Sequence, residues 1–142
     1  MLRLVVLTLI LSTFATYAFA DSCPPEEARR AELQSDNLRT WHALYKSFES
    51  YRECDDGATA EGYSESVARI LVDHWKRLPE LADLSLKDPD FGHFVLRHVD
   101  ATLDIGDLDK IRHKASAQCP VALRKLCVDL QKQASLARKE LH

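Results

Sequence analysis

Residues 58–78 read ATAEGYSESVARILVDHWKRL, and this stretch decides the predicted fold class. Its apolar and aromatic side chains, together with one histidine, recur every three or four residues, which is the spacing of one face of an α-helix. The positions on this face are Tyr63, Val67, Ile70, Leu71, His74, Trp75 and Leu78. Ala58, Gly62 and Ser66 form a second strip of small residues on which another helix could pack closely. We predict a helix that begins near Ala58 and is kinked or ended by Pro79.

Helical spacing continues on both sides of this segment. Upstream, residues 25–53 open with prolines and glutamates suited to a helix start, and Asp36-Asn37 leaves open whether they form one helix or two. Downstream, the apolar pattern predicts a third helix from Asp88-Pro89, a shorter fourth helix after Gly106 and a last one after Cys119-Pro120. No sustained alternating run is found in the sequence, so we predict no sheet. The predicted fold class is all-α, a small antiparallel bundle of about five helices.

The first 20 residues have the three-part pattern of a cleavable export signal. Arg3 supplies a positive charge, residues 4–11 form an apolar run, and Ala18-Phe19-Ala20 places small residues at the −3 and −1 positions of a cleavage site. The run is shorter than the about 20 residues of a transmembrane anchor. We therefore expect an exported protein, periplasmic or extracellular and soluble after cleavage near Ala20, with a single helical domain over 21–142.

Four cysteines, all after the predicted signal, predict two disulfides in a small exported domain. No closely spaced pair such as C-x-x-C is present, which argues against a zinc site. Cys119 and Cys127 on one helix would have α-carbons about 12 Å apart, whereas a disulfide needs about 7 Å or less. Cys23 and Cys54 would flank up to about 45 Å of helix unless the chain folds back near Asp36. These separations disfavour both local pairs, so Cys23 and Cys54 should each pair with Cys119 or Cys127, which would tie the first helix to the last. An up-and-down bundle places Cys23 and Cys119 at the same end, which favours Cys23–Cys119 with Cys54–Cys127.

Chemistry-bearing motifs are missing from the sequence. None of the six histidines belongs to an HExxH pattern, and no CxxCH haem site exists. The stretch from Gly62 to Ser66, GYSES, lacks the closing glycine and the preceding strand of a nucleophile elbow. We predict no catalytic residue, no metal ligand and no cofactor. His74 and His98 lie in apolar stripes and are expected in the core, either as hydrogen-bonded core histidines or as a pH-sensitive or metal-binding pair.

Charge narrows the expected partners. The net charge is −3, and it becomes −4 without the signal, which holds one arginine and no acid. This balance argues against nucleic acid as a partner, and no later stretch is long enough to be an integral membrane segment. Asp55 and Asp56 crowd one predicted turn and Asp104 and Asp107 another, and an up-and-down bundle would place both turns at one end. These aspartates are either a surface that docks a basic protein or ordinary helix caps.

Together these features predict a non-enzymatic exported module that binds another protein through its acidic end, an inhibitor or immunity-type protein being one form of that role. One alternative is a carrier of a small ligand or metal in the bundle interior, and a less favoured one is a cell-envelope enzyme. In class, such a domain is similar to the periplasmic immunity proteins that act against secreted cell-wall hydrolases and to periplasmic acid-stress chaperones. No motif of either group is present, so no residue role is carried over.

Overall fold

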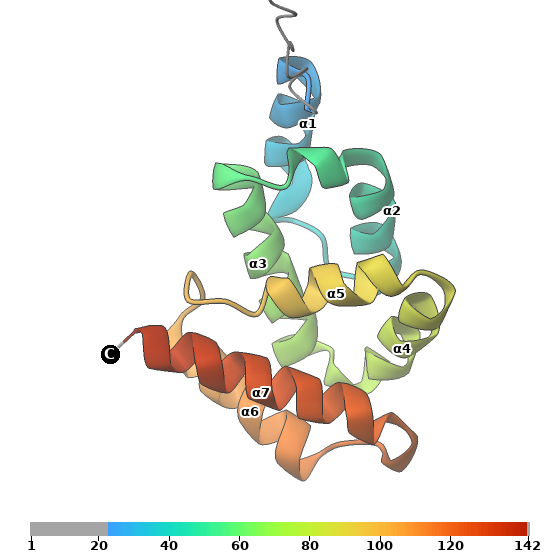
Figure 1. Ribbon diagram of the computed structural model, residues 1–142, viewed down its shortest axis with the longest axis vertical. Helices are drawn as coiled ribbons and strands as arrows, with labels where there is room; N and C mark the ends of the chain where they lie inside the picture. The colour runs from blue at the N-terminus through green and yellow to red at the C-terminus, as the bar shows by residue number, and fades with distance from the viewer. Residues whose placement is uncertain (1–22, 142) are drawn as a thin grey trace, which may run out of the picture.

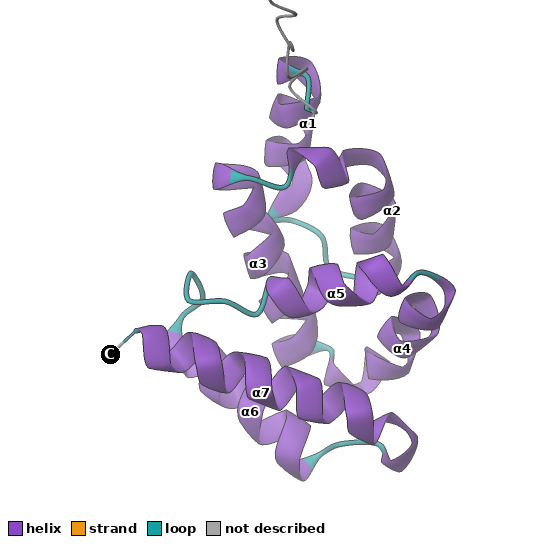
Figure 2. Cartoon of the chain, viewed as in Figure 1, coloured by secondary structure: helices purple, strands orange, loops and turns teal. Residues whose placement is uncertain are grey.

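The computed structural model describes residues 23–141, and the predicted signal, residues 1–20, lies outside the described residues. Within the described range the chain forms seven α-helices and three short 3-10 turns and no strand (Figures 1 and 2). The α-helices are α1 (Pro25–Ser35), α2 (Trp41–Tyr51), α3 (Gly57–Asp73), α4 (Leu78–Lys87), α5 (Pro89–Arg97), α6 (Ile105–Ala117) and α7 (Arg124–Glu140). The all-α class is confirmed, with more helices than the about five predicted. None of these described helices combines the length and the apolar character that crossing a membrane requires.

The predicted helical region 25–53 is broken into two helices. α1 ends at Ser35, the chain turns through residues 36–40, and α2 starts afresh at Trp41. Thr40 caps the new helix, because its side-chain oxygen accepts a hydrogen bond of 3.1 Å from the Ala43 amide. The break decides between the two alternatives that the sequence left open, in favour of two separate helices.

α1 packs on α3 at the strip of small residues predicted from the sequence. A β-carbon on Gly62 would clash with the Ser35 side chain and lie 3.0 Å from the backbone nitrogen of Asp36. The Ser66 hydroxyl donates to the carbonyl oxygen of Ser35 and accepts a hydrogen bond of 3.1 Å from the amide of Leu38. Close approach at a glycine, together with hydrogen bonds from a buried serine, therefore anchors the end of α1.

The helix predicted over 58–78 ends earlier than expected. α3 stops at Asp73, and a 3-10 turn over Trp75–Arg77 leads into α4, in which Pro79 is the second residue. Pro79 thus lies in the first turn of a helix, where its missing N–H costs nothing, and does not end one. The expectation for the next helix holds, since the Asp88 side chain caps α5 by accepting a hydrogen bond of 3.1 Å from the Asp90 amide.

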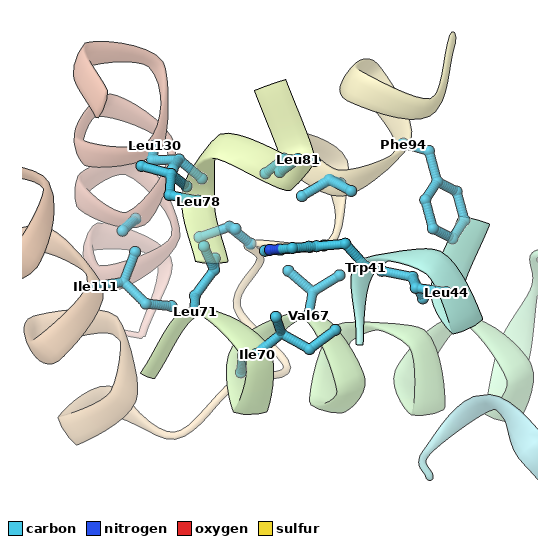
Figure 3. Packing of buried hydrophobic residues seen from close by; sticks show 14 of the residues in the cluster. Trp41, Leu44, Val67, Ile70, Leu71, Leu78, Leu81, Phe94, Ile111 and Leu130 are labelled. Atoms are coloured by element: carbon cyan, nitrogen blue, oxygen red, sulfur yellow. The ribbon is translucent and has the colours of Figure 1, made fainter. Parts of the chain in front are cut away.

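The core lies where α2, α3, α4 and α5 meet the α6–α7 pair, whose helices run side by side in Figure 1. Figure 3 shows Trp41 of α2 between Val67 of α3 and Leu81 of α4, with Ile111 of α6 and Leu130 of α7 to one side. All five side chains are buried. Full burial of one such aliphatic side chain stabilises the fold by about 1.5–3 kcal/mol, so this shared cluster is what holds the helices together.

The disulfides differ from the predicted pairing, which was wrong. Cys23 bonds to Cys54, with α-carbons 4.9 Å apart, and Cys119 bonds to Cys127, with α-carbons 6.0 Å apart. The break at 36–40 folds the chain back, so that Cys54 returns to Cys23. Cys119 precedes α7 and is separated from it by a 3-10 turn, so it does not share a helix with Cys127. Both bridges are local because neither pair spans a continuous helix.

Candidate functional site

Four polar side chains converge in the interior between α3, the end of α5 and the turn that precedes α3. Ser64 Oγ lies 2.9 Å from Nδ1 of His98 and 2.7 Å from a carboxylate oxygen of Asp100. On its other side, Nε2 of His98 lies 3.1 Å from an oxygen of Asp55. Ser64 is only 1% exposed and His98 only 3%. We refer to Asp55, Ser64, His98 and Asp100 as the buried polar cluster.

Hydrogen-bond counting assigns the hydrogens of this cluster. The single hydroxyl hydrogen of Ser64 has two possible acceptors, the Asp100 carboxylate at 2.7 Å and the Ala60 carbonyl at 3.1 Å, and the shorter contact favours Asp100. Ser64 Oγ must then accept from Nδ1–H of His98, while Nε2–H of the same ring donates to the Asp55 carboxylate. His98 thus bridges the Ser64 hydroxyl on one side of its ring and the Asp55 carboxylate on the other.

The electrostatics of Asp55 agree with this assignment. Burial alone raises the pKa of the Asp55 carboxyl, but the hydrogen bonds and positive charges of His98 and Arg97 outweigh it and hold that pKa below its usual range. Arg97 donates to Asp55 at 2.8 Å from the solvent side. The ionised form of Asp55 is therefore the form that the fold favours.

Asp55, Ser64 and His98 are the residue types of a hydrolase triad, but their arrangement does not activate a nucleophile. An attacking serine needs access to substrate and a neutral imidazole nitrogen to take its proton. Ser64 is buried, it donates to Asp100, and both nitrogens of His98 are engaged as donors. What the cluster does is link α3, the end of α5 and the turn before α3 through hydrogen bonds between buried polar groups.

Acid is expected to destabilise the protein through Asp55. The folded pKa of Asp55 is lowered, so its contribution to stability is complete above about pH 4, where an unfolded aspartate is ionised, and is lost as pH falls through the lower folded pKa. An Asp55→Asn variant should show a flatter fall in the free energy of unfolding between about pH 4 and pH 2 than the wild type. Urea denaturation at a series of pH values measures this slope.

The control is Asp56→Asn, which removes the same charge from the neighbouring residue. Asp56 is exposed and caps α3 by accepting a hydrogen bond of 2.7 Å from the Gly57 amide, without contacting His98. Because asparagine caps a helix about as well as aspartate, this variant should lose little stability and keep the wild-type slope. Equal slopes for the wild type and Asp55→Asn would contradict the assigned ion pair.

The structure gives the four aspartates of the predicted acidic end different tasks. Asp55 belongs to the buried polar cluster, and Asp107 is nearly buried between Arg69 and Lys110. Asp56 caps α3, and Asp104 caps α6, where it accepts a hydrogen bond of 2.8 Å from Gly106. The two turns do meet, because Ser64 and His98 join Asp55 to Asp100. Of the four predicted residues, Asp56 and Asp104 are the exposed ones.

The two core histidines of the sequence prediction lie in different surroundings. His98 is buried, whereas His74 is exposed at the C-cap of α3. Ser64, which contacts His98, precedes His74 by ten residues, about 15 Å along a helix. The two imidazoles are not partners. Among the described residues, no group of three or more His, Cys, Asp or Glu side chains is arranged to hold a metal ion.

The second feature is an apolar groove of about 430 Å³ between α4, α5 and the start of α7. Leu86, which lines the groove, is 83% exposed. Val121 is 85% exposed; it belongs to the same 3-10 turn as the lining residues Ala122 and Leu123, and its own side chain lines the neighbouring hollow beside Cys119. The charged lining residues Lys125 and Asp129 pair at 2.8 Å. We refer to this feature as the α4–α5–α7 groove, and its apolar lining is Ala82, Leu86, Pro89, Leu96, Leu123 and Leu126.

Comparisons with protein families, with curated proteins and with solved structures found no match to this chain.

Sequence reasoning identified some members of both features and missed their assembly. It placed His98 in the core and Asp55 in a turn, but nothing in the sequence joined them to Ser64, which is 34 residues from His98. A polar residue inside a helical apolar stripe was the only available signal. The groove had no sequence signal at all, because its walls come from helices that are far apart along the chain.

Proposed function

We propose that this chain is a non-enzymatic, exported module that binds another protein, an inhibitor or immunity-type protein being one form of that role. The observation that carries the proposal is an apolar groove whose wall residue Leu86 is strongly exposed, with the exposed Val121 in the adjoining 3-10 turn. Each such side chain would gain about 1.5–3 kcal/mol by leaving water. Exposed apolar surface of this kind marks sites of protein association.

The closed state of the buried polar cluster supports the non-enzymatic part of the proposal. Its serine, histidine and carboxylates hydrogen-bond one another away from solvent, which is the arrangement of a structural network. A carrier function has less support, since the bundle interior is filled by the apolar cluster around Trp41. The exposed Asp56 and Asp104 stay candidates for a secondary contact with a basic region of the partner.

Affinity capture tests the proposal. Immobilised wild-type protein is expected to retain a specific partner from the exported fraction of its host, identified by mass spectrometry and confirmed with the purified partner. A Leu86→Ser/Val121→Ser variant should retain at least ten-fold less, because the partner's apolar side chains lose the surface that they bury.

The matched control is Leu33→Ser on α1, which alters an apolar side chain that is also strongly exposed but lies away from the groove. This variant should capture the partner as the wild type does. If no protein is retained by wild type or control, the binding function is wrong. If all three baits retain the partner equally, the module binds through another surface.

A further inference from the structure

We infer that the α4–α5–α7 groove and the adjoining outer face of α7 receive an acidic amphipathic helix of a partner protein. The inference rests on the proposed binding function, and it specifies the surface used and the chemistry of the partner.

One wall of the groove is set by tight packing between α4 and α5. A β-carbon on Gly92 of α5 would lie 2.9 Å from the hydroxyl oxygen of Ser85 on α4, so only glycine allows this approach. The Ser85 hydroxyl is itself tied to the carbonyl oxygen of Leu81 at 2.7 Å. The α4–α5 wall is thus in place before any partner arrives, which reduces the entropy cost of binding.

The exposure of the walls favours a macromolecule over a small ligand. Small-ligand pockets enclose most of their ligand's surface. Here Leu86 on one wall and the side chain of Lys125 on the other both face solvent, at 83% and 91% exposure. A small molecule in the groove would leave these two side chains exposed to solvent. A partner segment lying along the groove covers them and buries its own apolar side chains between them.

Charge selects an acidic partner. Residues 105–140, which contain α6 and α7, have eight Lys and Arg against four Asp and Glu, a net charge of +4. Residues 23–104 have ten against seventeen, a net charge of −7. A basic region is therefore concentrated on one hairpin of an acidic protein. A segment that docks on α7 meets a favourable field only if it is acidic, and the rest of the molecule would repel it.

The outer face of α7 repeats its charges at a helical interval. Lys125, Lys132 and Lys139 are exposed and follow one another at intervals of seven residues, so they lie along one face with about 10.5 Å between successive lysines. Val128 and Leu136, also exposed, lie beside them. Lys125 already pairs with Asp129, whereas no ion pair joins Lys132 or Lys139 to another of the described residues. Lys132 and Lys139 thus present charges without an internal partner, next to exposed apolar side chains.

A helix is the partner segment that matches this pattern. A helix lying along α7 presents acidic side chains with the same two-turn repeat, opposite the lysines. Its apolar side chains at i, i+3 or i+4, and i+7 then point toward the groove, which is the usual way in which an amphipathic helix is bound. Acidic residues flanking an apolar stripe therefore define the expected partner.

Selection from a phage-displayed library tests this without assuming one partner sequence. The library displays 18-residue amphipathic helices in which the apolar stripe is kept and the flanking positions are randomised to Glu, Lys, Gln or Ser. The bait is the disulfide-intact protein recovered from the exported fraction. Selected helices are expected to be net negative, to bind wild type at least ten-fold tighter than Leu86→Ser/Val121→Ser, and to lose at least ten-fold in affinity for Lys125→Glu/Lys132→Glu. Circular dichroism of each bait confirms that it is folded.

Selection on the Lys125→Glu/Lys132→Glu bait should reverse the preference to basic helices. Lys46→Glu/Lys76→Glu, which changes two exposed lysines outside α7, is the control and should keep the acidic preference. The inference is overturned if the wild-type bait selects neutral or basic helices, or selects no helix. It is also overturned if the same lysines mediate self-association of the protein or its binding to phosphatidylglycerol vesicles. The proposed function survives these results if affinity capture still finds a partner, and it fails separately if capture finds none.

Discussion

Replacing His98 with alanine is expected to lower the free energy of unfolding by about 3–5 kcal/mol, because it removes the interior hydrogen-bond partner of the buried Asp55 carboxylate. Asp55 would keep only the solvent-facing Arg97, and its carboxylate would stay largely buried. Ser64 would lose its donor while remaining in the interior. The ring also packs edge-on against Phe94, with centroids 4.4 Å apart, so a cavity adds to the electrostatic loss.

His93→Ala is the matched control for His98→Ala. Both residues belong to the same segment of chain, but His93 lies on the exposed side of α5. Its substitution should change the free energy of unfolding by no more than about 0.5 kcal/mol. Urea denaturation followed by circular dichroism measures both variants.

A double-mutant cycle between His98→Ala and Asp55→Ala then isolates the pair. We expect the two losses to be non-additive by about 1–3 kcal/mol, since either substitution alone leaves the other group unpaired. A loss below about 1 kcal/mol for His98→Ala with additive effects in the cycle would mean that the cluster does not hold the helices.

Removing the Cys23–Cys54 bridge by a Cys23→Ala/Cys54→Ala substitution is expected to cost about 3–4 kcal/mol. The bridge joins residues 31 apart, and the chain-entropy model gives about 3.7 kcal/mol for a loop of that size. Cys119→Ala/Cys127→Ala removes a bridge between residues 8 apart, for which the same model gives about 2.5 kcal/mol. Removing the bridge that closes the longer loop should therefore cost more stability. Removing either bridge should cost less than the about 4–5 kcal/mol expected for a link between the first and last helices.

Hydrogen exchange shows which part of the chain each bridge stabilises, in addition to how large its contribution is. α1 buries only Ala31 and Ser35 along its own length, so without the Cys23 bridge its first turns should open and exchange faster than α3. The variant without Cys119 and Cys127 should instead open the start of α7. A peptide map that joins Cys23 to Cys119, or a larger loss from the shorter loop, would contradict this connectivity.

The helices were predictable where local patterns decide them. The stripe from Tyr63 to Leu71 requires a helix whichever neighbours surround it, and Asp88 with Pro89 marks a helix start by local hydrogen bonding and a fixed φ. The end of α3 was not predictable in this way. The apolar stripe continues through Trp75 into Leu78, although the helix itself stops at Asp73, because a change of direction can keep the same face buried.

Pairings across the chain were beyond the reach of the same reasoning. The predicted disulfides were wrong because the distance between cysteines was taken along an assumed continuous helix. The turn at 36–40 breaks that helix and brings Cys23 to Cys54. The two acidic turns were expected at one end of the bundle, with their aspartates either forming a docking surface or capping helices. In the structure, Asp55 contacts His98 and Asp107 contacts Arg69.

By itself, the amino-acid sequence determined the helical class, the small strip at Gly62 and Ser66, and the capping residues, since periodicity and capping depend on residues within a turn or two of one another. Only the tertiary structure decided the bridges, the buried polar cluster and the groove. His98 lies 34 residues from Ser64 and 43 from Asp55, and the groove combines α4 and α5 with α7. Such contacts depend on how the helices turn back on one another, which no local pattern along the chain encodes.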